Sequence, residues 1–84
     1  MTYVYVIRNE LNGEEFYVGV TNDLERRLKD HNTSRNRSTR GGQWRIVYYE
    51  AYLTLGAARR REHRLKHGGK ARKALLERIK MDLE

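Results

Sequence analysis

Two short runs of β-branched and aromatic residues with a turn signal between them restrict the fold of this chain more than any other feature. The runs cover residues 3–8 and 16–20, and Asn12-Gly13 lies between them. Such a pattern predicts a β-hairpin. A plain two-residue turn at Asn12-Gly13 would place Tyr5 and Tyr17 on opposite faces of the ribbon, whereas a loop of odd length or a bulge would place both on one face.

A helix and a polar loop are predicted after the hairpin. Asn22 and Asp23 provide helix-capping side chains, and Glu25 stands in capping-box position after Asn22, so we expect a helix over residues 23–31. Residues 32–42 are rich in Asn, Ser, Thr, Arg and Gly, and we expect a mobile basic loop there.

The C-terminal half predicts a third strand and two further helices. The strand covers residues 44–49 and returns to cover the hairpin, and Thr54 caps a helix that ends near residue 67. Gly68-Gly69 terminates this helix, and a last helix follows over residues 70–80. The element order is therefore β-β-α-β-α-α, an α+β arrangement in a single domain over residues 1–84.

Basic side chains are concentrated in two windows of the sequence. The chain has 18 Lys and Arg against 11 Asp and Glu, a net charge of +7, and residues 26–45 and 59–73 hold 15 of the 18 cations but only two of the acids. Such segregation is typical of a surface that follows a phosphate backbone, with two solvated helix faces as the simpler alternative. We expect nucleic acid to contact Arg26, Lys29, Arg35, Arg37, Arg40, Arg59, Arg61, Lys66 and Lys70.

The composition also excludes several kinds of site. Because the chain has no cysteine, it has no disulfide framework, no thiolate zinc site and no cysteine nucleophile. The longest apolar run, residues 3–7, is too short for a membrane span or for the core of a signal peptide. We therefore expect a soluble cytoplasmic protein with no membrane partner, and its charge is compatible with association with the nucleoid.

One acid interrupts the apolar stripe of the second predicted helix. Leu55, Ala58, Glu62 and Leu65 follow a helical spacing that places all four on one face. A carboxylate on such a face is costly unless it is paired or coordinates a metal. Glu62 is therefore either a metal ligand or the partner of a neighbouring cation, Arg59 or Lys66.

The first predicted helix and the hairpin add four polar candidates. Arg27 and His31 share or border the inward face of their helix, where arginine can hold a phosphate oxygen and histidine can move a proton near neutral pH. Their simpler alternatives are a boundary arginine and a histidine favoured by the helix dipole. Tyr5 and Tyr17 are either core residues or phenols of a site, and Gly19 leaves room for a close approach to the backbone.

These residues together resemble a known family. Residues 3–5 (Tyr-Val-Tyr), 17–19 (Tyr-Val-Gly), 21–31 and 57–66 are similar to the GIY-YIG nuclease domain, in its short stand-alone branch of UPF0213 type. The resemblance covers nearly the whole chain. Two features depart from the family pattern: Tyr3 replaces the glycine that opens the first motif, and no asparagine after Glu62 matches the one found in some relatives.

The resemblance implies a fold, a reaction and a role for each candidate residue. It implies a small three-stranded antiparallel sheet flanked by helices, and divalent-metal-dependent cleavage of a phosphodiester. Tyr5 and Tyr17 would be the tyrosines of the two motifs, Arg27 the phosphate-stabilising arginine, and His31 the residue that follows one helical turn later. Glu62 would bind Mg²⁺ or Mn²⁺.

Two functions from different classes follow. The first is an endonuclease that hydrolyses DNA, branched or single-stranded forms included, with water activated by Tyr17 or by Tyr5 and His31. The second is a non-catalytic module that binds DNA or structured RNA through the same basic surface. We expect a monomer or a weak homodimer in either case. Catalysis requires both tyrosines to face one cavity with Arg27 and Glu62, and hence an odd loop or a bulge in the hairpin.

Overall fold

The computed structural model describes residues 1–33 and 37–84, except for the side chain of Ser38. The elements follow the predicted order, with one short 3-10 helix inserted before the third strand. Their bounds are β1 Thr2–Asn9, β2 Phe16–Thr21, α1 Leu24–Asn32, η1 Arg37–Thr39, β3 Trp44–Tyr52, α2 Leu55–His67 and α3 Gly69–Leu83. The α+β fold class is therefore confirmed. No helix within the described residues has the length and apolar character needed to cross a membrane.

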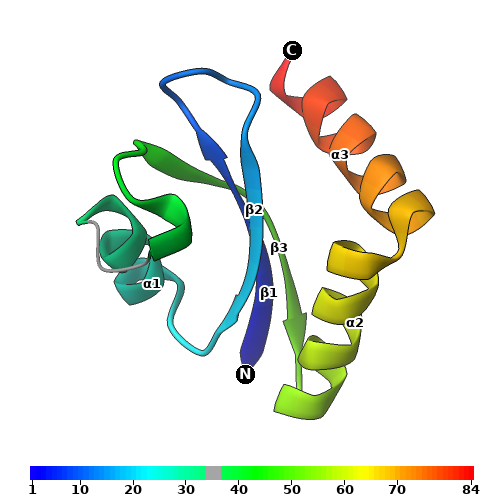
Figure 1. Cartoon of the computed structure of the whole chain (residues 1–84). Coiled ribbons are helices and arrows are strands. Elements are labelled where there is room, and N and C mark those ends of the chain that lie inside the picture. Colours follow the sequence, from blue (N-terminus) through cyan, green and yellow to red (C-terminus); the bar gives the residue numbers. More distant parts are fainter. Residues whose placement is uncertain (34–36) are drawn as a thin grey trace.

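The three strands form one antiparallel sheet in the order β2-β1-β3, so β1 is central and β2 lies at an edge. Helix α1 covers one face of this sheet, and α2 with α3 covers the other (Figure 1). The third strand does not cover the hairpin but extends the sheet beside β1, and it runs three residues past the predicted end. A register shift between Val6 and Ile7 leaves Val47 as an extra residue in β3.

The hairpin has the odd loop that a shared face for the two tyrosines requires. In the β1–β2 register Tyr5 pairs with Gly19 and Ile7 pairs with Tyr17, so Tyr5 and Tyr17 lie on the same face. The Asn9 amide donates to the Glu15 carbonyl at 2.9 Å, which closes a loop over residues 10–14. Gly13 occupies the left-handed region of the backbone, at φ 69°.

Two apolar clusters form, one on each face of the sheet. Between the sheet and α2 with α3 the buried members are Val4, Val6, Val18, Ala58, Leu65, Leu75 and Ile79. Between the sheet and α1 they are Tyr5, Ile7 and Trp44, against which Tyr17, Leu24, Leu28 and Ile46 pack. Because alternate residues of β1 point to opposite faces, its hydrophobic run supplies both clusters.

The helices differ from the predictions in their bounds, in one cap and in one apolar stripe. Helix α1 is shifted by one residue, and α3 begins at Gly69 and continues to Leu83 rather than residue 80. Helix α1 is capped by Asp23, which accepts a hydrogen bond from the Arg26 amide, so the expected capping box of Asn22 and Glu25 does not form. Helix α2 is capped by Thr54 as predicted. Its apolar stripe is shorter than predicted, since Leu55 at its first turn is 49% exposed.

The basic segment before β3 is more ordered than a mobile loop where it is described. Residues 37–39 form η1, and Thr39 is 1% exposed. The Thr39 carbonyl accepts hydrogen bonds from Trp44 Nε1 at 2.9 Å and from the Gly42 amide at 3.2 Å. These contacts attach the segment to the beginning of β3. Residues 34–36 of the predicted loop lie outside the described residues.

Candidate active site

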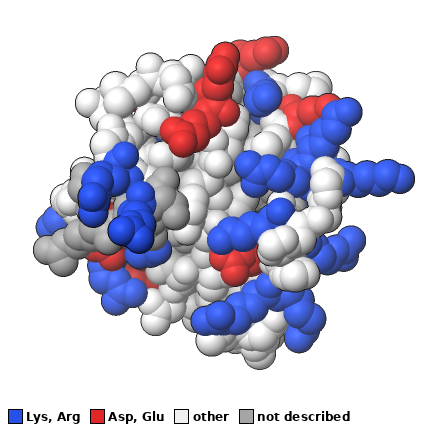
Figure 2. Space-filling model, viewed as in Figure 1, with Lys and Arg blue, Asp and Glu red and all other residues white. Residues whose placement is uncertain are grey.

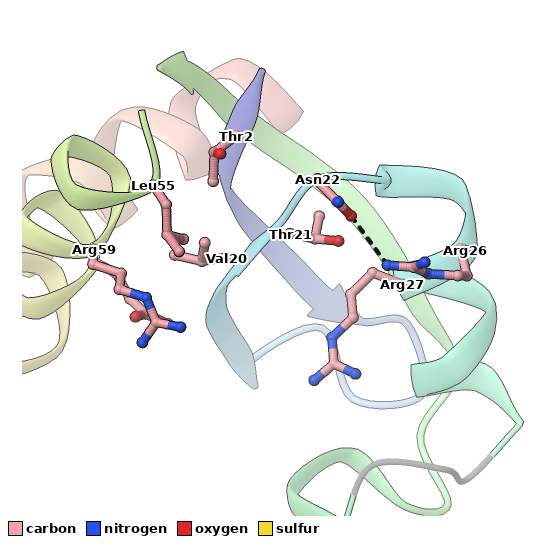
Figure 3. A pocket seen from close by; sticks show the side chains of 9 residues that line it. Thr2, Val20, Thr21, Asn22, Arg26, Arg27, Leu55 and Arg59 are labelled. Carbon is pink, nitrogen blue, oxygen red and sulfur yellow. Dashed lines mark hydrogen bonds between the residues drawn. The ribbon is translucent and has the colours of Figure 1, made fainter. Parts of the chain in front are cut away.

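An open cavity of about 480 Å³ lies at the edge of the sheet formed by β2. Its walls come from β2 and the start of β1, from α1 and from α2, and its lining residues are Thr2, Val20, Thr21, Asn22, Arg26, Arg27, Leu55, Arg59 and Glu62. Arg27 from α1 and Arg59 from α2 extend toward the same space (Figure 3). The edge of the sheet is where the helices on opposite faces contribute side chains to one cavity.

Beside this cavity, Tyr5 is held in a buried hydrogen-bond network. Its side chain is 1% exposed, and its phenol lies directly over Gly19, where a Cβ would come within 2.5 Å of Tyr5 Cζ. Tyr5 Oη lies 2.7 Å from His31 Nε2 and accepts a hydrogen bond from Arg27 Nε at 3.2 Å. His31 Nδ1 lies 2.7 Å from Thr39 Oγ1. The cavity residue Arg27 is thereby joined to a polar chain beneath the surface.

Burial changes the acid–base character of this network. Desolvation raises the pKa of Tyr5 to about 12, with smaller contributions from Tyr17 and Glu62, although the hydrogen bond and charge of Arg27 act in the opposite sense. Desolvation and then the Arg27 charge lower the pKa of His31 to about 4. Both groups are therefore neutral at pH 7. The sequence predicted that His31 can move a proton near neutral pH. It does not titrate there, because it is fully buried.

Tyr17 contacts residues of both α1 and α2. Its ring centroid is 5.0 Å from that of His31, and Lys66 Nζ lies 5.2 Å from the same tyrosine ring. Neither Tyr17 nor Tyr5 belongs to the lining of the cavity. The prediction that both phenols share a sheet face is confirmed. The expected common cavity is not found, because the cavity that brings together Arg27 and Glu62 is lined by neither tyrosine.

Glu62 lines the cavity and is also paired. Its carboxylate lies 3.3 Å from Lys66 Nζ, one turn later on α2, with 23% of the Glu62 side chain and 36% of the Lys66 side chain exposed. The ion pair considered from sequence is thus present, with Lys66 rather than Arg59 as the partner. Lys66 also links the Glu62 carboxylate to the Tyr17 ring.

The donor set at Glu62 restricts which metal could bind. In the described part of the chain, no group of three or more His, Cys, Asp or Glu could hold a metal ion. A single carboxylate suits Mg²⁺ or Mn²⁺, because Mg²⁺ keeps several waters and takes further ligands from substrate phosphates. Glu62, which opens onto the cavity, therefore fits a hard divalent cation of this kind and would have to separate from Lys66 to bind it.

The residues predicted to contact nucleic acid differ in where they lie and in whether they are paired. Figure 2, viewed as in Figure 1, shows Lys and Arg gathered on both sides of a central region that is mostly uncharged but carries Asp and Glu at its upper end. The basic groups lie on the side of α1 and on the side of α2 and α3. Arg26 and Arg59 line the cavity at the β2 edge, and Lys29 lines a smaller one on α1. Arg37, Arg40 and Lys70 are exposed, and Lys66 is paired with Glu62. Arg35 lies outside the described residues.

Arg61, which was also predicted to contact nucleic acid, instead belongs to a hydrogen-bond network between α2 and β3. Its guanidinium donates to both carboxylate oxygens of Glu50 at 2.9 and 3.0 Å, and the hydroxyls of Tyr48 and Tyr52 donate to the same carboxylate at 2.5 and 2.6 Å. Burial alone would raise the pKa of Glu50, but these hydrogen bonds outweigh it and lower the pKa to about 2. Arg61 is therefore committed to β3, which its position next to Glu62 did not indicate.

Sequence reasoning missed Glu50 and Thr39. The alternation of Tyr48, Glu50 and Tyr52 along one face of a strand is a signal that could have revealed the first network. For Thr39 the sequence holds no comparable signal, because its contact with His31 depends on how the segment between α1 and β3 folds back.

Comparison with known proteins agrees with this fold. Residues 1–75 match the family model of the GIY-YIG catalytic domain. The chain is 36% identical to a UPF0213 protein of Haloquadratum walsbyi over 66 residues, which cover 76% of this chain and 72% of that protein. It is 38% identical to a UPF0213 protein of Clostridium perfringens over 68 residues, which cover 79% of this chain and 71% of the relative.

A solved structure extends the similarity to three dimensions. The solution NMR structure of a UPF0213 protein from Bacillus halodurans superposes with a TM-score of 0.55 and 34% sequence identity, covering 95% of this chain and 86% of that one. The family match spans the strands and the helices that form the cavity at the β2 edge. The chain therefore belongs to the GIY-YIG catalytic domain family, which is a nuclease family.

Proposed function

We propose that this protein is a divalent-metal-dependent endonuclease that hydrolyses phosphodiester bonds in DNA. The observation that carries the proposal is the meeting of Arg27 and Glu62, from helices on opposite faces of the sheet, in one cavity at the β2 edge. Cleavage of a bound phosphodiester requires a cationic hydrogen-bond donor and a carboxylate able to hold a metal ion, one on each side of the phosphate.

Arg27 has the role of binding the scissile phosphate. Its Nε donates to Tyr5 Oη and its Nη1 lies 3.9 Å from Asp30 Oδ2, so Nη2 is the nitrogen that we assign to a phosphate oxygen. The Arg27 side chain is 31% exposed and lines the cavity. Its guanidinium stays charged at any relevant pH. As the attacking oxygen bonds to phosphorus and the bond to the 3′ oxygen breaks, Arg27 balances the negative charge that develops on the phosphoryl oxygens.

Glu62 has the role of holding Mg²⁺ or Mn²⁺. When bound, the cation would supply Lewis-acid stabilisation of the leaving 3′ oxygen. The other residues position the reactants. Tyr5, protonated at neutral pH and hydrogen-bonded to Arg27, fixes the orientation of that guanidinium. We assign Tyr17 to orient the attacking water. It does not line the cavity, but its ring lies beside Lys66, the cation that pairs with the cavity residue Glu62.

The test is a cleavage assay with supercoiled, single-stranded and branched DNA in the presence of Mg²⁺ or Mn²⁺. We expect Arg27→Ala and Glu62→Gln to lose about 100-fold or more in cleavage rate, the scale on which transition-state contacts act. Matched controls are Arg78→Ala and Glu77→Gln, both exposed on α3, which should cleave as the unchanged protein does. Equal cleavage by all five proteins would identify a contaminating nuclease and remove the basis of the proposal.

A non-catalytic nucleic-acid-binding module is the second candidate. The observation that favours it is the Glu62–Lys66 pair, which neutralises the carboxylate within a basic surface. Salt-sensitive binding of DNA or structured RNA that Glu62→Gln leaves unchanged, with no nicking in any metal, would select this function instead.

A further inference from the structure

Four side chains form a continuous buried chain that ends at the proposed phosphate-binding arginine. Thr39 Oγ1 contacts His31 Nδ1 at 2.7 Å, His31 Nε2 contacts Tyr5 Oη at 2.7 Å, and Arg27 Nε donates to Tyr5 Oη at 3.2 Å. Thr39 is 1% exposed, His31 0% and Tyr5 1%. Because Tyr5 and His31 are fully buried, the donor and acceptor of each of their contacts restrict those of the next contact.

The hydrogen bonds of Tyr5 favour a ring proton on Nδ1 of His31. Arg27 Nε can only donate, so it uses one lone pair of Tyr5 Oη, and the phenol proton must be accepted elsewhere. Among the described residues, His31 Nε2 is the acceptor at hydrogen-bond distance. That nitrogen is therefore unprotonated, and the ring proton lies on Nδ1.

The opposite tautomer would leave the network unsatisfied. With the proton on Nε2, two donors would point at Tyr5 Oη, and the phenol proton would lack an acceptor among the described groups. With the proton on Nδ1, that N–H donates to Thr39 Oγ1, and each contact in the chain has one donor and one acceptor.

We propose that Thr39 is a positioning residue that holds His31 as its Nδ1–H tautomer, so that the hydroxyl of Tyr5 points away from Arg27 and leaves the guanidinium oriented toward the cavity. The part of this inference that concerns Arg27 in catalysis rests on the proposed function. The assignment of the His31 tautomer does not depend on that function.

A merely structural role of Thr39 can be separated from this positioning role. Trp44 Nε1 and the Gly42 amide both bind the carbonyl of Thr39, not its hydroxyl. Thr39→Val keeps these backbone contacts and nearly the same shape while it removes the hydroxyl, and Thr39→Ser restores the hydroxyl on a smaller side chain. Thr33→Val is the matched control, because Thr33 is exposed and its hydroxyl binds the Lys29 carbonyl.

The decisive measurement is long-range ¹H–¹⁵N NMR of the His31 ring in the full chain without DNA, which distinguishes the two tautomers. We expect Nδ1–H in the unchanged protein, in Thr39→Ser and in Thr33→Val. In Thr39→Val each tautomer leaves one buried proton without the acceptor it has now, so we expect a mixture or the Nε2–H form. An Nε2–H ring in the unchanged protein would overturn the proposal, as would a Thr39→Val ring that stays Nδ1–H. If Thr39→Val fails to fold, the unchanged protein and Thr39→Ser still decide the tautomer.

Cleavage kinetics provide a second readout. We expect Thr39→Val to lower kcat about tenfold with KM nearly unchanged, and Thr39→Ser to restore most of it, since residues that orient a catalytic group act at about this level. Unchanged kcat in Thr39→Val would refute the positioning role. If the unchanged protein cleaves no substrate, the proposed function fails, whereas the NMR result still stands for or against the role of Thr39.

Discussion

Acid should destabilise this protein through His31 well before its carboxylates are protonated. The native state keeps the imidazole neutral, with a pKa of about 4, because the ring is buried and faces Arg27, whereas the unfolded chain protonates it near 6.5. Below about pH 6.5 the unfolded state therefore binds more protons, and the free energy of unfolding falls as the pH falls. The stabilisation is complete above that pH and is lost progressively down to about pH 4.

The two pKa values determine the size of the effect. Between about pH 7.5 and pH 5 the linkage amounts to about 2 kcal/mol, a large part of the roughly 4–13 kcal/mol expected for a chain of this length. Urea unfolding at both pH values measures it, with His31→Gln as the comparison because that variant cannot titrate at this position. The exposed His63 and His67 are present in both proteins and cancel in the difference.

Two outcomes would refute this reasoning. If the unchanged protein and His31→Gln lose the same stability between the two pH values, another group is responsible for the acid effect. If the variant does not fold, an NMR titration of the His31 ring protons in the unchanged protein replaces it. A midpoint near pH 6.5, the ordinary value, would show that burial does not hold the ring neutral.

Three other perturbations test the packing and charges around the site. Gly19→Ala should cost about 1–3 kcal/mol in urea unfolding and displace the Tyr5 phenol, because the added Cβ occupies its place. Glu50→Gln should cost about 1–3 kcal/mol at pH 7 by breaking a charged network, and should abolish the loss of stability that the unchanged protein shows as the pH falls from about 4.5 to 2. Lys66→Met should strengthen Mn²⁺ binding by about fivefold, because it removes the cation 3.3 Å from the Glu62 carboxylate. Electron paramagnetic resonance measures the Mn²⁺ affinity, and an unchanged affinity would place the metal elsewhere.

The sequence predicted the elements well but left the hairpin register open. The strand residues and Asn12-Gly13 fit a two-residue turn equally well, and that turn would have separated the tyrosines. The longer loop is held by side chains, since Asn12 Oδ1 accepts from the Glu14 amide at 3.0 Å and Asn9 Oδ1 accepts from the Leu11 amide at 3.1 Å. Such Asx contacts compete with the tight turn, and local propensity does not rank them against it.

The candidate site could be predicted in membership but not in chemical state. Helical spacing placed Arg27 and His31 on the inward face of α1 and Glu62 on that of α2, because a periodic pattern fixes direction. Burial and the charge of Arg27 keep His31 neutral, and its Nδ1 contacts Thr39 from a separate segment. Glu62 is paired with Lys66. These are contacts between side chains whose geometry only the folded chain determines.

The position of β2 at the edge of the sheet explains how this small fold can form a site at all. Arg27 and Glu62 belong to helices on opposite faces, and a central strand would keep them apart with a full layer of sheet between them. At the edge, the two faces meet around a single strand. Gly19 removes the side chain of that strand where Tyr5 on β1 must cross it, so the phenol reaches Arg27 from the sheet interior. A fourth strand paired to β2 would cover the cavity, and a larger residue at position 19 would displace the phenol. The glycine and the unpaired edge are therefore two parts of one requirement, which is access from both layers to the proposed phosphate site.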